Sequence, residues 1–491
     1  MRDLRRRALE SNKTLSRKAQ SRGVSHPGSR TPSAHSSPQP SRTASRNVSR
    51  HPSDDEETDN LSDDAAWSNT SVDELLAEDD EPDSEAHRAG LKDVVEELID
   101  RKRSSVQGRE SYLFALVRIL TAHYKQDELY PSLNELLKSL AKSIKTESSE
   151  RETILALRAT SLVAVTMIDD TIYPAMGSVI KRAIMDSPST SVKSAAIRCL
   201  SACAVFGGAG EDGIFTEMSF LMEIIESDGH FIGSPDDPDT VTAALQEWGV
   251  LATHIDDLEQ ESEEAISAFA EQLESSETSV QVAAGENIAL LYEKSYTPRE
   301  EDESDDEAEE DDIEHTTDDD DMSTPSDDEE GGIKLVKRYT AYHNTPHIVR
   351  QVESLASVSS KYITKKDKRS LHSSFASVLS TVTNPRRGPH YSNAIDRETD
   401  QSYGNRKTVR FHRNSYMHVD RWWKRMRLSS MRHILGGGFV NHYIEGNRAI
   451  METLPVRLEV GSSSTFGNSR TKAFGKRAGR VKGADVLASS P

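Results

Sequence analysis

Basic side chains are concentrated in the carboxyl-terminal third of this chain, at spacings suited to binding phosphate groups. Lys365, Lys366, Lys368 and Arg369 open a segment that is predicted to be helical. The N-terminal end of a helix already carries partial positive charge, so cations there are unfavourable unless an anion binds nearby. The predicted chemistry is therefore phosphate binding. A solvated charged face or a nuclear-localisation-like patch is an equally weighted alternative.

A second basic segment follows, in which basic and apolar side chains alternate imperfectly. An extended conformation would place Arg406, Arg410 and His412 on one side of the chain. Val409 and Phe411 would lie on the other side. The pattern predicts a short strand with one cationic face.

A predicted helix at 420–435 has two unlike halves on a helical wheel, one basic and one carrying Trp422 and Trp423. Arginine binds phosphate oxygens through two N–H groups, which makes the basic half the better candidate for phosphate contact. The two tryptophans are either core residues, which is the commoner case, or platforms for base stacking. The candidate RNA- or phosphate-binding residues are Lys365, Lys366, Lys368, Arg369, Arg406, Lys407, Arg410, Arg413, Arg421, Lys424, Arg425 and Arg432.

Charge is sorted along the chain, whose formal net charge is −22. Lysine and arginine set against aspartate and glutamate give +10 over residues 1–53, −51 over 54–330 and +19 over 331–491. A strongly cationic region inside an acidic protein indicates a polyanionic partner for that region.

Apolar residues between 88 and 297 recur at helical spacing. Leu91, Val94, Val95 and Leu98, for example, fall on one face of a predicted helix. No part of this region shows the sustained alternation and turn dipeptides that would indicate strands. The region is therefore predicted to be all-α.

The helical region also repeats. Val192 and Val280 lie 88 residues apart, and each is followed at the same distance by an Ala-Ala pair. This offset is twice a period of about 44 residues, which is typical of armadillo and HEAT repeats. In each copy we expect a turn containing serine or threonine to cap the next helix. The predicted fold is an all-α, armadillo- or HEAT-like helical-repeat solenoid with a small basic C-terminal module and long disordered segments.

Composition divides the chain into segments that can and cannot bury a core. Residues 300–330 hold 20 acidic and no basic residues, and like-charge repulsion favours a solvated run there. The predicted parts are a disordered region at 1–87 that is basic and then acidic, a helical-repeat domain at 88–383 with an acidic disordered insertion at 298–332, a basic module at 404–460 and a disordered basic tail at 461–491.

No pattern typical of catalysis or cofactor binding emerges. The glycine-rich segment 207–213 lacks the Lys-Ser/Thr of a phosphate-binding loop. The histidines have neither zinc-type spacing nor cysteine partners, and the acidic residues fall in solvated runs. We expect no enzymatic activity, cofactor, metal or small-molecule substrate.

The two cysteines and the lack of apolar runs bear on location. Cys199 and Cys203 lie four residues apart on one predicted helix face, as buried reduced thiols would, which favours a reducing compartment. No apolar run is long enough for a bilayer, and no apolar segment follows the N-terminal arginines as in a secretory signal. We expect a cytoplasmic protein, with the nucleus as a second location.

Several segments together resemble the interferon-related developmental regulator family. Residues 360–379 are similar to its signature segment, and residues 409–411, 419–422 and 435–442 are similar to its separate C-terminal motif. Residues 91–168 also resemble the family's N-terminal helical region. The resemblance implies an armadillo-like fold without enzymatic activity.

Members of that family are described in two roles: ribosome association with repression of translation, and transcriptional co-regulation through nuclear corepressor complexes. The first hypothesis is a non-enzymatic regulator that binds the ribosome and ribosomal RNA through the basic C-terminal region and represses translation. The alternative is a nuclear co-regulator scaffold that binds corepressor proteins through the helical-repeat surface. Neither hypothesis involves a membrane.

Overall fold

The computed structural model describes residues 89–101, 104–298, 335–357, 365–395, 402–412 and 414–458. The predicted disordered segments at 1–87 and 461–491 and nearly all of the acidic insertion lie outside these residues, as does Arg413.

Helical hairpins form the body of the described chain, as the apolar periodicity predicts. Each hairpin is a pair of consecutive helices in contact. The pairs are α5 (Leu91–Ile99) with α6 (Val106–Ala122), α8 (Leu133–Thr146) with α9 (Glu150–Met167), α10 (Ile172–Asp186) with α11 (Thr190–Phe206), α12 (Gly210–Glu226) with α13 (Pro238–Ala252), α14 (Glu259–Gln272) with α15 (Thr278–Lys294), and α16 (Thr345–Ser357) with α17 (Lys365–Thr383).

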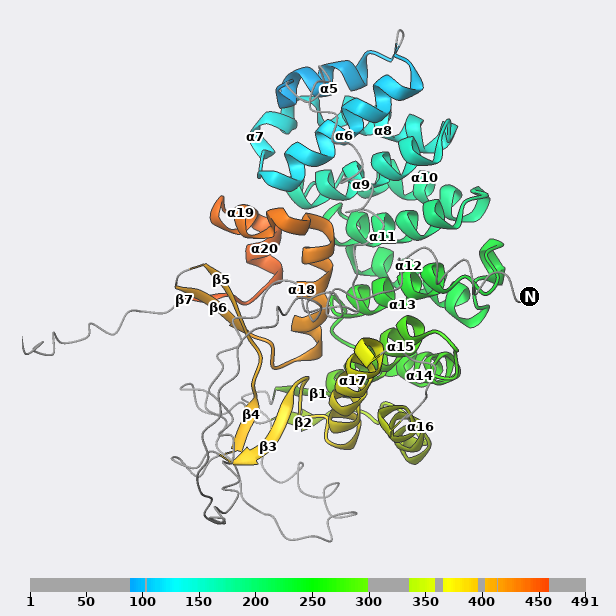
Figure 1. The fold of residues 1–491 in the computed structure, drawn as a ribbon, viewed down its shortest axis with the longest axis vertical. Coiled ribbons are helices and arrows are strands. Elements are labelled where there is room, and N and C mark those ends of the chain that lie inside the picture. The colour runs from blue at the N-terminus through cyan, green and yellow to red at the C-terminus, as the bar shows by residue number, and fades with distance from the viewer. Residues whose placement is uncertain are drawn as a thin grey trace, which may run out of the picture. The chain divides into compact units, whose positions relative to one another are not determined.

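The second helices of the hairpins form a continuous row. In this second row, α6, α9, α11, α13, α15 and α17 contact one another in that order, and Figure 1 shows the hairpins running from blue at α5 to yellow at α17. Among the first helices, α5, α8 and α10 contact in sequence, and so do α12 and α14. Helices that bury one face on their partner and others on the neighbouring hairpins form a helical-repeat array. The predicted all-α solenoid class is confirmed.

Three helices of the second row are buried almost all round. The buried residues run without a break from Glu152 to Met167 in α9 and from Thr240 to Ala252 in α13, and nearly so in α15. A helix packed only by its hairpin partner and its row neighbours would leave one face in water. Another element must therefore cover this face of the row.

The repeat inferred from Val192 and Val280 is confirmed. Both residues lie at the third position of their helices, α11 and α15, which are the second helices of hairpins two apart. Ser189 caps α11, because its hydroxyl accepts the N–H of Val192 at 3.3 Å. The expected side-chain cap is wrong in the second copy, because Glu277 precedes α15 and makes no such bond.

The strands that flank the acidic segment pair with each other. β1 (Tyr296–Pro298) is antiparallel to β2 (Leu335–Lys337), so the chain leaves and re-enters the array at one place. Helices α15 and α17, on either side of the acidic segment in sequence, remain in contact. The acidic segment therefore interrupts one array of hairpins.

The C-terminal part combines two small sheets with short helices. β3 (Tyr391–Ile395) pairs with β4 (Ser402–Asn405), and β5 (Thr408–His412), β6 (Ser415–His418) and β7 (Arg457–Leu458) form a three-stranded antiparallel sheet. Between β6 and β7 come α18 (Trp422–Leu435), the 3₁₀ turn η5 (Gly436–Gly438), α19 (Phe439–Ile444) and α20 (Arg448–Thr453).

Two further expectations concern cysteines and membranes. Cys199 and Cys203 are free and fully buried in α11, as predicted. Within the part of the chain that is described, no helix combines the length and the apolar character needed to cross a membrane.

Candidate nucleic-acid interface

Helix α18 is the element that covers the second row. It contacts α6, α9, α13 and α15, and α19 and α20 contact α6 and α9 beside it. Figure 1 shows α18 lying alongside the green helices of the array. The basic helix predicted from sequence is therefore part of the protein core, and its charges have to be read against the helices beneath it.

A buried carboxylate holds the N-terminal end of α18. Glu293 of α15 accepts the backbone N–H of Trp422 at 2.8 Å and that of Trp423 at 3.3 Å. These are N–H groups that the first turn of a helix cannot satisfy itself. Burial raises the pKa of Glu293 to about 7, while the nearby Arg421 and the two N–H groups act in the opposite direction.

The raised pKa of Glu293 should make the free energy of unfolding depend on pH. A carboxyl whose pKa is higher in the folded state contributes stability that is complete below its unfolded pKa and is lost as pH rises through about 7. Compared with the Glu293→Gln variant, the wild-type chain should lose about 3 kcal/mol of unfolding free energy between pH 4 and pH 8. Urea unfolding of both proteins across this range measures the difference. If the difference in unfolding free energy between the two proteins did not change with pH, the raised pKa of Glu293 would be contradicted.

Two basic side chains of α18 form ion pairs within the protein, and Arg421 just before the helix bonds to a carbonyl. Arg425 donates to Glu286 of α15 at 2.6 Å, and the side chains are only 11% and 4% exposed. Lys424 pairs with Asp420 at 2.6 Å, and Arg421 donates to the carbonyl of Arg386 at 3.3 Å.

The basic half of this helix is therefore not an open surface, and its contact with phosphate stays a prediction. Arg421, Lys424, Arg425 and Arg432 are all half-buried. The physical reason is that α15 supplies Glu286 and Glu293 to this helix, which a helical wheel of α18 alone cannot reveal.

Trp422 is a core residue. Its side chain is fully buried, and its indole N–H donates to the hydroxyl of Thr381 in α17 at 2.8 Å. Trp423 is half-buried, with the guanidinium of Arg427 4.9 Å from its ring centroid. Of the two roles considered from sequence, the structure assigns Trp422 to the core.

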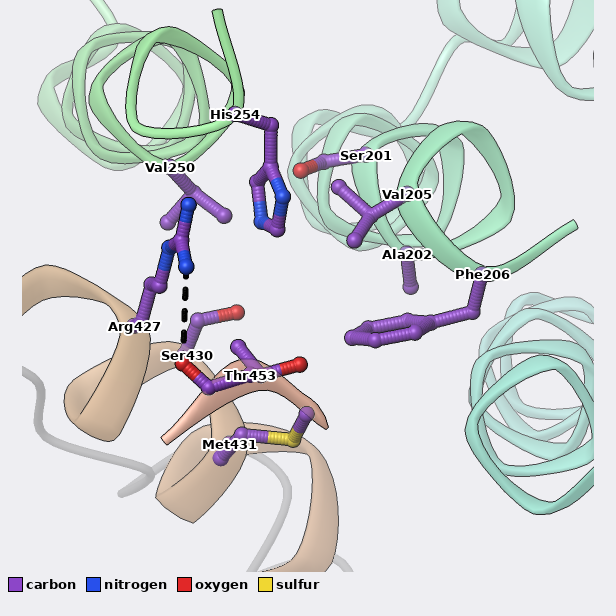
Figure 2. A pocket seen from close by; sticks show the side chains of 10 residues that line it. All are labelled: Ser201, Ala202, Val205, Phe206, Val250, His254, Arg427, Ser430, Met431 and Thr453. Carbon is purple, nitrogen blue, oxygen red and sulfur yellow. Dashed lines mark hydrogen bonds between the residues drawn. The ribbon is translucent and has the colours of Figure 1, made fainter. Parts of the chain in front are cut away.

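Arg427 is a docking residue that the sequence analysis missed. It donates to the hydroxyl of Thr253 at 3.1 Å and to its carbonyl at 2.5 Å, which ties α18 to the end of α13. Figure 2 shows it at a small cavity of about 10 Å³, where it also bonds to the carbonyl of Thr453. Burial, followed by the charges of Arg427 and Lys294, lowers the pKa of His254 in this cavity to about 3. The space admits a water molecule at most, so it is a packing defect between helices.

The three glycines after α18 make a close backbone contact. Gly436 ends the helix with φ +50°, a backbone conformation that favours glycine. A Cβ at Gly438 would lie 1.6 Å from the carbonyl oxygen of Thr121, so only glycine allows this approach to α6. Beside it, His442 Nε2 lies 2.8 Å from the carbonyl of Leu120. These contacts fix the far end of the C-terminal module on the first hairpin.

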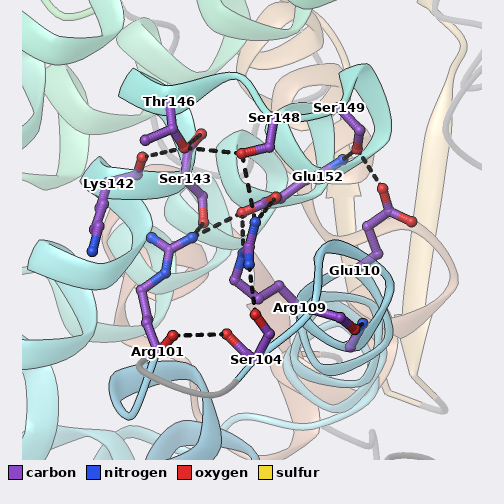
Figure 3. Close-up of polar contacts among 12 residues, drawn as sticks. Arg101, Ser104, Arg109, Glu110, Lys142, Ser143, Thr146, Ser148, Ser149 and Glu152 are labelled. Carbon is purple, nitrogen blue, oxygen red and sulfur yellow. Dashed lines mark hydrogen bonds and ion pairs between the residues drawn. The ribbon is translucent and has the colours of Figure 1, made fainter.

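A buried ionic cluster closes the same first hairpin. Glu152 has no exposed side-chain surface and pairs with Arg101 at 2.9 Å and Arg109 at 2.8 Å (Figure 3). Burial by itself raises the pKa of Glu152, but the bonds from Arg109 and Ser143 and the two positive charges hold it below its usual value. The cluster joins α6, α9 and the turn after α5, so it is structural. Sequence reasoning missed it, because its members are more than 40 residues apart.

The remaining candidate cations keep their charge at the surface. Arg369 in α17, Arg406 and Arg410 are exposed, and the Arg406 guanidinium lies 3.5 Å from the ring centroid of Tyr403. Lys368 and Lys407 are half-buried. Lys365 and Lys366 begin α17, and their side chains lie outside the described residues, as does Arg413.

Arg369 does not lie beside the start of α18. Thr381, which holds Trp422, lies twelve residues beyond Arg369 in the same helix. At the helical rise, this places the two roughly 18 Å apart. The described residues also include no group of three or more histidine, cysteine, aspartate or glutamate side chains that could hold a metal. Among the candidates from sequence, the exposed cations of the described residues therefore lie near the start of α17 and in the segment around β4 and β5.

A sequence model of the interferon-related developmental regulator (IFRD) family matches residues 56–383, more than half of the chain. The chain belongs to the IFRD family. The match ends at Thr383, the last residue of α17, so it covers the helical hairpins and stops before the sheets and α18.

Two other proteins are similar to this IFRD chain. An uncharacterized protein of Schizosaccharomyces pombe is 27% identical over 360 residues, which cover 72% of this chain and 71% of the relative. A designed armadillo repeat protein aligns with 59% of this chain and 100% of its own length, at 14% identity and a TM-score of 0.32. The helical-repeat fold stated above rests on the helix contacts themselves.

Proposed function

We propose that this IFRD chain is a non-enzymatic regulator that binds the ribosome through ribosomal RNA and represses translation. One observation carries the proposal: Lys424 and Arg425 of α18 form ion pairs within the protein, whereas Arg369, Arg406 and Arg410 are exposed. Exposed arginines suit a densely charged polyanion such as RNA, because a guanidinium binds phosphate oxygens through two N–H groups.

The contacts of the C-terminal module support this role in a second way. The module is attached to α15 by the bond from the Trp422 N–H to Glu293, to α13 by the bond from Arg427 to Thr253, and to α6 by the close approach of Gly438 to Thr121. A cationic segment attached at several points loses little conformational entropy when it binds, which favours affinity for a large rigid particle. The helical array would then act as a scaffold and as a steric block on the particle.

The buried titratable groups support a role without catalysis. Glu152, Glu286, Glu293 and His442 each join helices of different hairpins or join the C-terminal module to the array. These contacts explain why the four side chains are buried, and no catalytic role is needed to explain it. The proposed partners are the ribosome and its RNA, and the proposed location is the cytoplasm.

The structure gives less support to the alternative, a nuclear transcriptional co-regulator scaffold. That role assumes that the repeat surface binds segments of other proteins. The face of the second row at α9, α13 and α15 is occupied by α18. A co-regulator would have to use a different surface.

The exposed arginines give the first test of the proposal. The variant Arg369→Gln/Arg406→Gln/Arg410→Gln should weaken co-sedimentation with ribosomes. The negative slope of log affinity against log salt should also become shallower by about 2, because each lost phosphate contact reduces its magnitude by about 0.7–0.9. Gradient sedimentation over a salt series measures both effects. A matched control, Lys145→Gln/Arg182→Gln/Arg350→Gln, removes exposed charges from α8, α10 and α16 and should change neither. Equal behaviour of the two variants would overturn the proposal.

A further inference from the structure

The three-stranded sheet has one face that its packing leaves open. Arg410 of β5 lies opposite Tyr416 of β6, and Tyr416 lies opposite Arg457 of β7. Directly paired residues of antiparallel strands point to the same face. The open face therefore presents a tyrosine ring with an arginine on each side.

A second aromatic ring extends this row. His418 follows Tyr416 by two residues on β6, so it lies on the same face, and the two ring centroids are 5.0 Å apart. His418 Nδ1 lies 2.8 Å from the hydroxyl of Thr408 on β5, which fixes the orientation of the imidazole. The two rings are thus held in contact, at an interplanar angle of 68°.

The opposite face of the sheet is sealed. Val409, Phe411 and Met417 are at most 3% exposed. The ring of Phe411 packs on Phe439 and Tyr443 of α19 at centroid distances of 5.4 and 5.5 Å. The alternation predicted for this segment is confirmed, and the open face rests on a packed support.

The open face carries two exposed arginines that have no ion pair among the described residues. Arg410, His418 and Arg457 are exposed, and Tyr416 is half-buried. No acidic side chain among the described residues forms an ion pair with Arg410 or Arg457. The face therefore combines aromatic rings with free guanidinium groups.

We propose that the open face of β5, β6 and β7 binds single-stranded RNA. Bases stack on Tyr416 and His418, and Arg410 and Arg457 contact the phosphates on either side. This inference rests on the proposed function in that it assumes an RNA partner. It names the surface, which includes Tyr416, His418 and Arg457, none of which was a candidate from sequence.

The chemistry favours a single strand over a duplex. Bases in a duplex are already stacked and paired, so their faces cannot reach aromatic side chains on a sheet. Unpaired bases offer a π-face to any ring, and this stacking tolerates different sequences. Single-stranded loops and messenger RNA segments are the RNA class that this face fits.

The test compares substitutions of one ring in the full chain. Tyr416→Val keeps a β-branched residue suited to the strand, and Tyr416→Phe keeps the ring. Binding of a short fluorescent single-stranded oligouridine should weaken by about 10-fold or more in Tyr416→Val and by no more than about twofold in Tyr416→Phe. Thermal unfolding midpoints confirm that both variants fold. Photocrosslinking of an iodouridine oligomer should label the peptide that contains Tyr416.

Other outcomes separate this inference from the proposed function. If both Tyr416 variants bind like wild type while the Arg369/Arg406/Arg410 variant loses ribosomes, the stacking face is overturned and the proposed function stands. Equal affinity for a duplex, or for polyglutamate, would also overturn the stacking face. If the wild-type chain binds neither the oligomer nor ribosomes, the proposed function itself fails.

Discussion

Replacing Arg425 with alanine should lower the unfolding free energy of the protein by about 3–5 kcal/mol. The substitution removes the guanidinium that pairs with the Glu286 carboxylate, 4% exposed, between α15 and α18. Removing one partner of a buried pair costs much more than the pair itself contributes, because the remaining charge stays desolvated. Urea unfolding measures the loss. Hydrogen exchange should show faster exchange in α18 than in α11.

Two controls separate this effect from a general loss of charge. Arg182→Ala removes a cation from an exposed pair with Asp186, at 3.8 Å, and should leave the unfolding free energy essentially unchanged. Replacing Glu286 and Arg425 together with leucine removes both buried charges, and most of the lost stability should return. An Arg425→Ala protein as stable as the Arg182→Ala protein would show that α18 does not depend on the ion pair.

Local sequence patterns predicted the features that local contacts determine. The period that relates Val192 to Val280, the burial of Cys199 with Cys203, and the helix end at Gly436 all follow from residues close together in sequence. Hairpins of this kind bury their apolar faces on immediate neighbours, so periodicity carries most of the information about them.

Long-range contacts could not be predicted in the same way. Arg425 pairs with Glu286, 139 residues earlier. Nothing in the sequence of α15 indicates which helix its buried side chains contact. A wheel of α18 assigns its polar half to solvent, since it represents one helix alone. β7 has only two residues, too few for a periodic signal, and without it the row from Arg410 to Arg457 is not apparent.

The docking of α18 links the fold to the proposed function. Charge within the C-terminal region is divided between structural cations, such as Arg425 and Arg427, and exposed ones, such as Arg406 and Arg410. The first group holds the module on the array, and the second is available to a partner. Substitutions in the two groups should therefore have separable effects, on stability in the first case and on salt-dependent binding in the second.

Trp422, where α15, α17 and α18 meet, should show most clearly that stability and salt-dependent binding are affected separately. Trp422→Ala should cost about 3–5 kcal/mol of unfolding free energy, because it opens a cavity in a fully buried site. The indole also donates to Thr381 of α17, and the backbone N–H of the same residue bonds to Glu293 of α15. The loss of the ring should therefore loosen α17 together with α18.

Hydrogen exchange and a second variant distinguish the ring from its hydrogen bond. Thr381→Val keeps the ring buried but removes the acceptor, and should cost about 1–3 kcal/mol, the penalty for an unsatisfied buried donor. In Trp422→Ala, amides of both α17 and α18 should exchange faster, while those of α10 should not change. Faster exchange in α18 alone would show that Trp422 does not couple the two helices. Because the ring is buried away from the exposed arginines, residual folded Trp422→Ala protein should keep the wild-type salt dependence of ribosome binding.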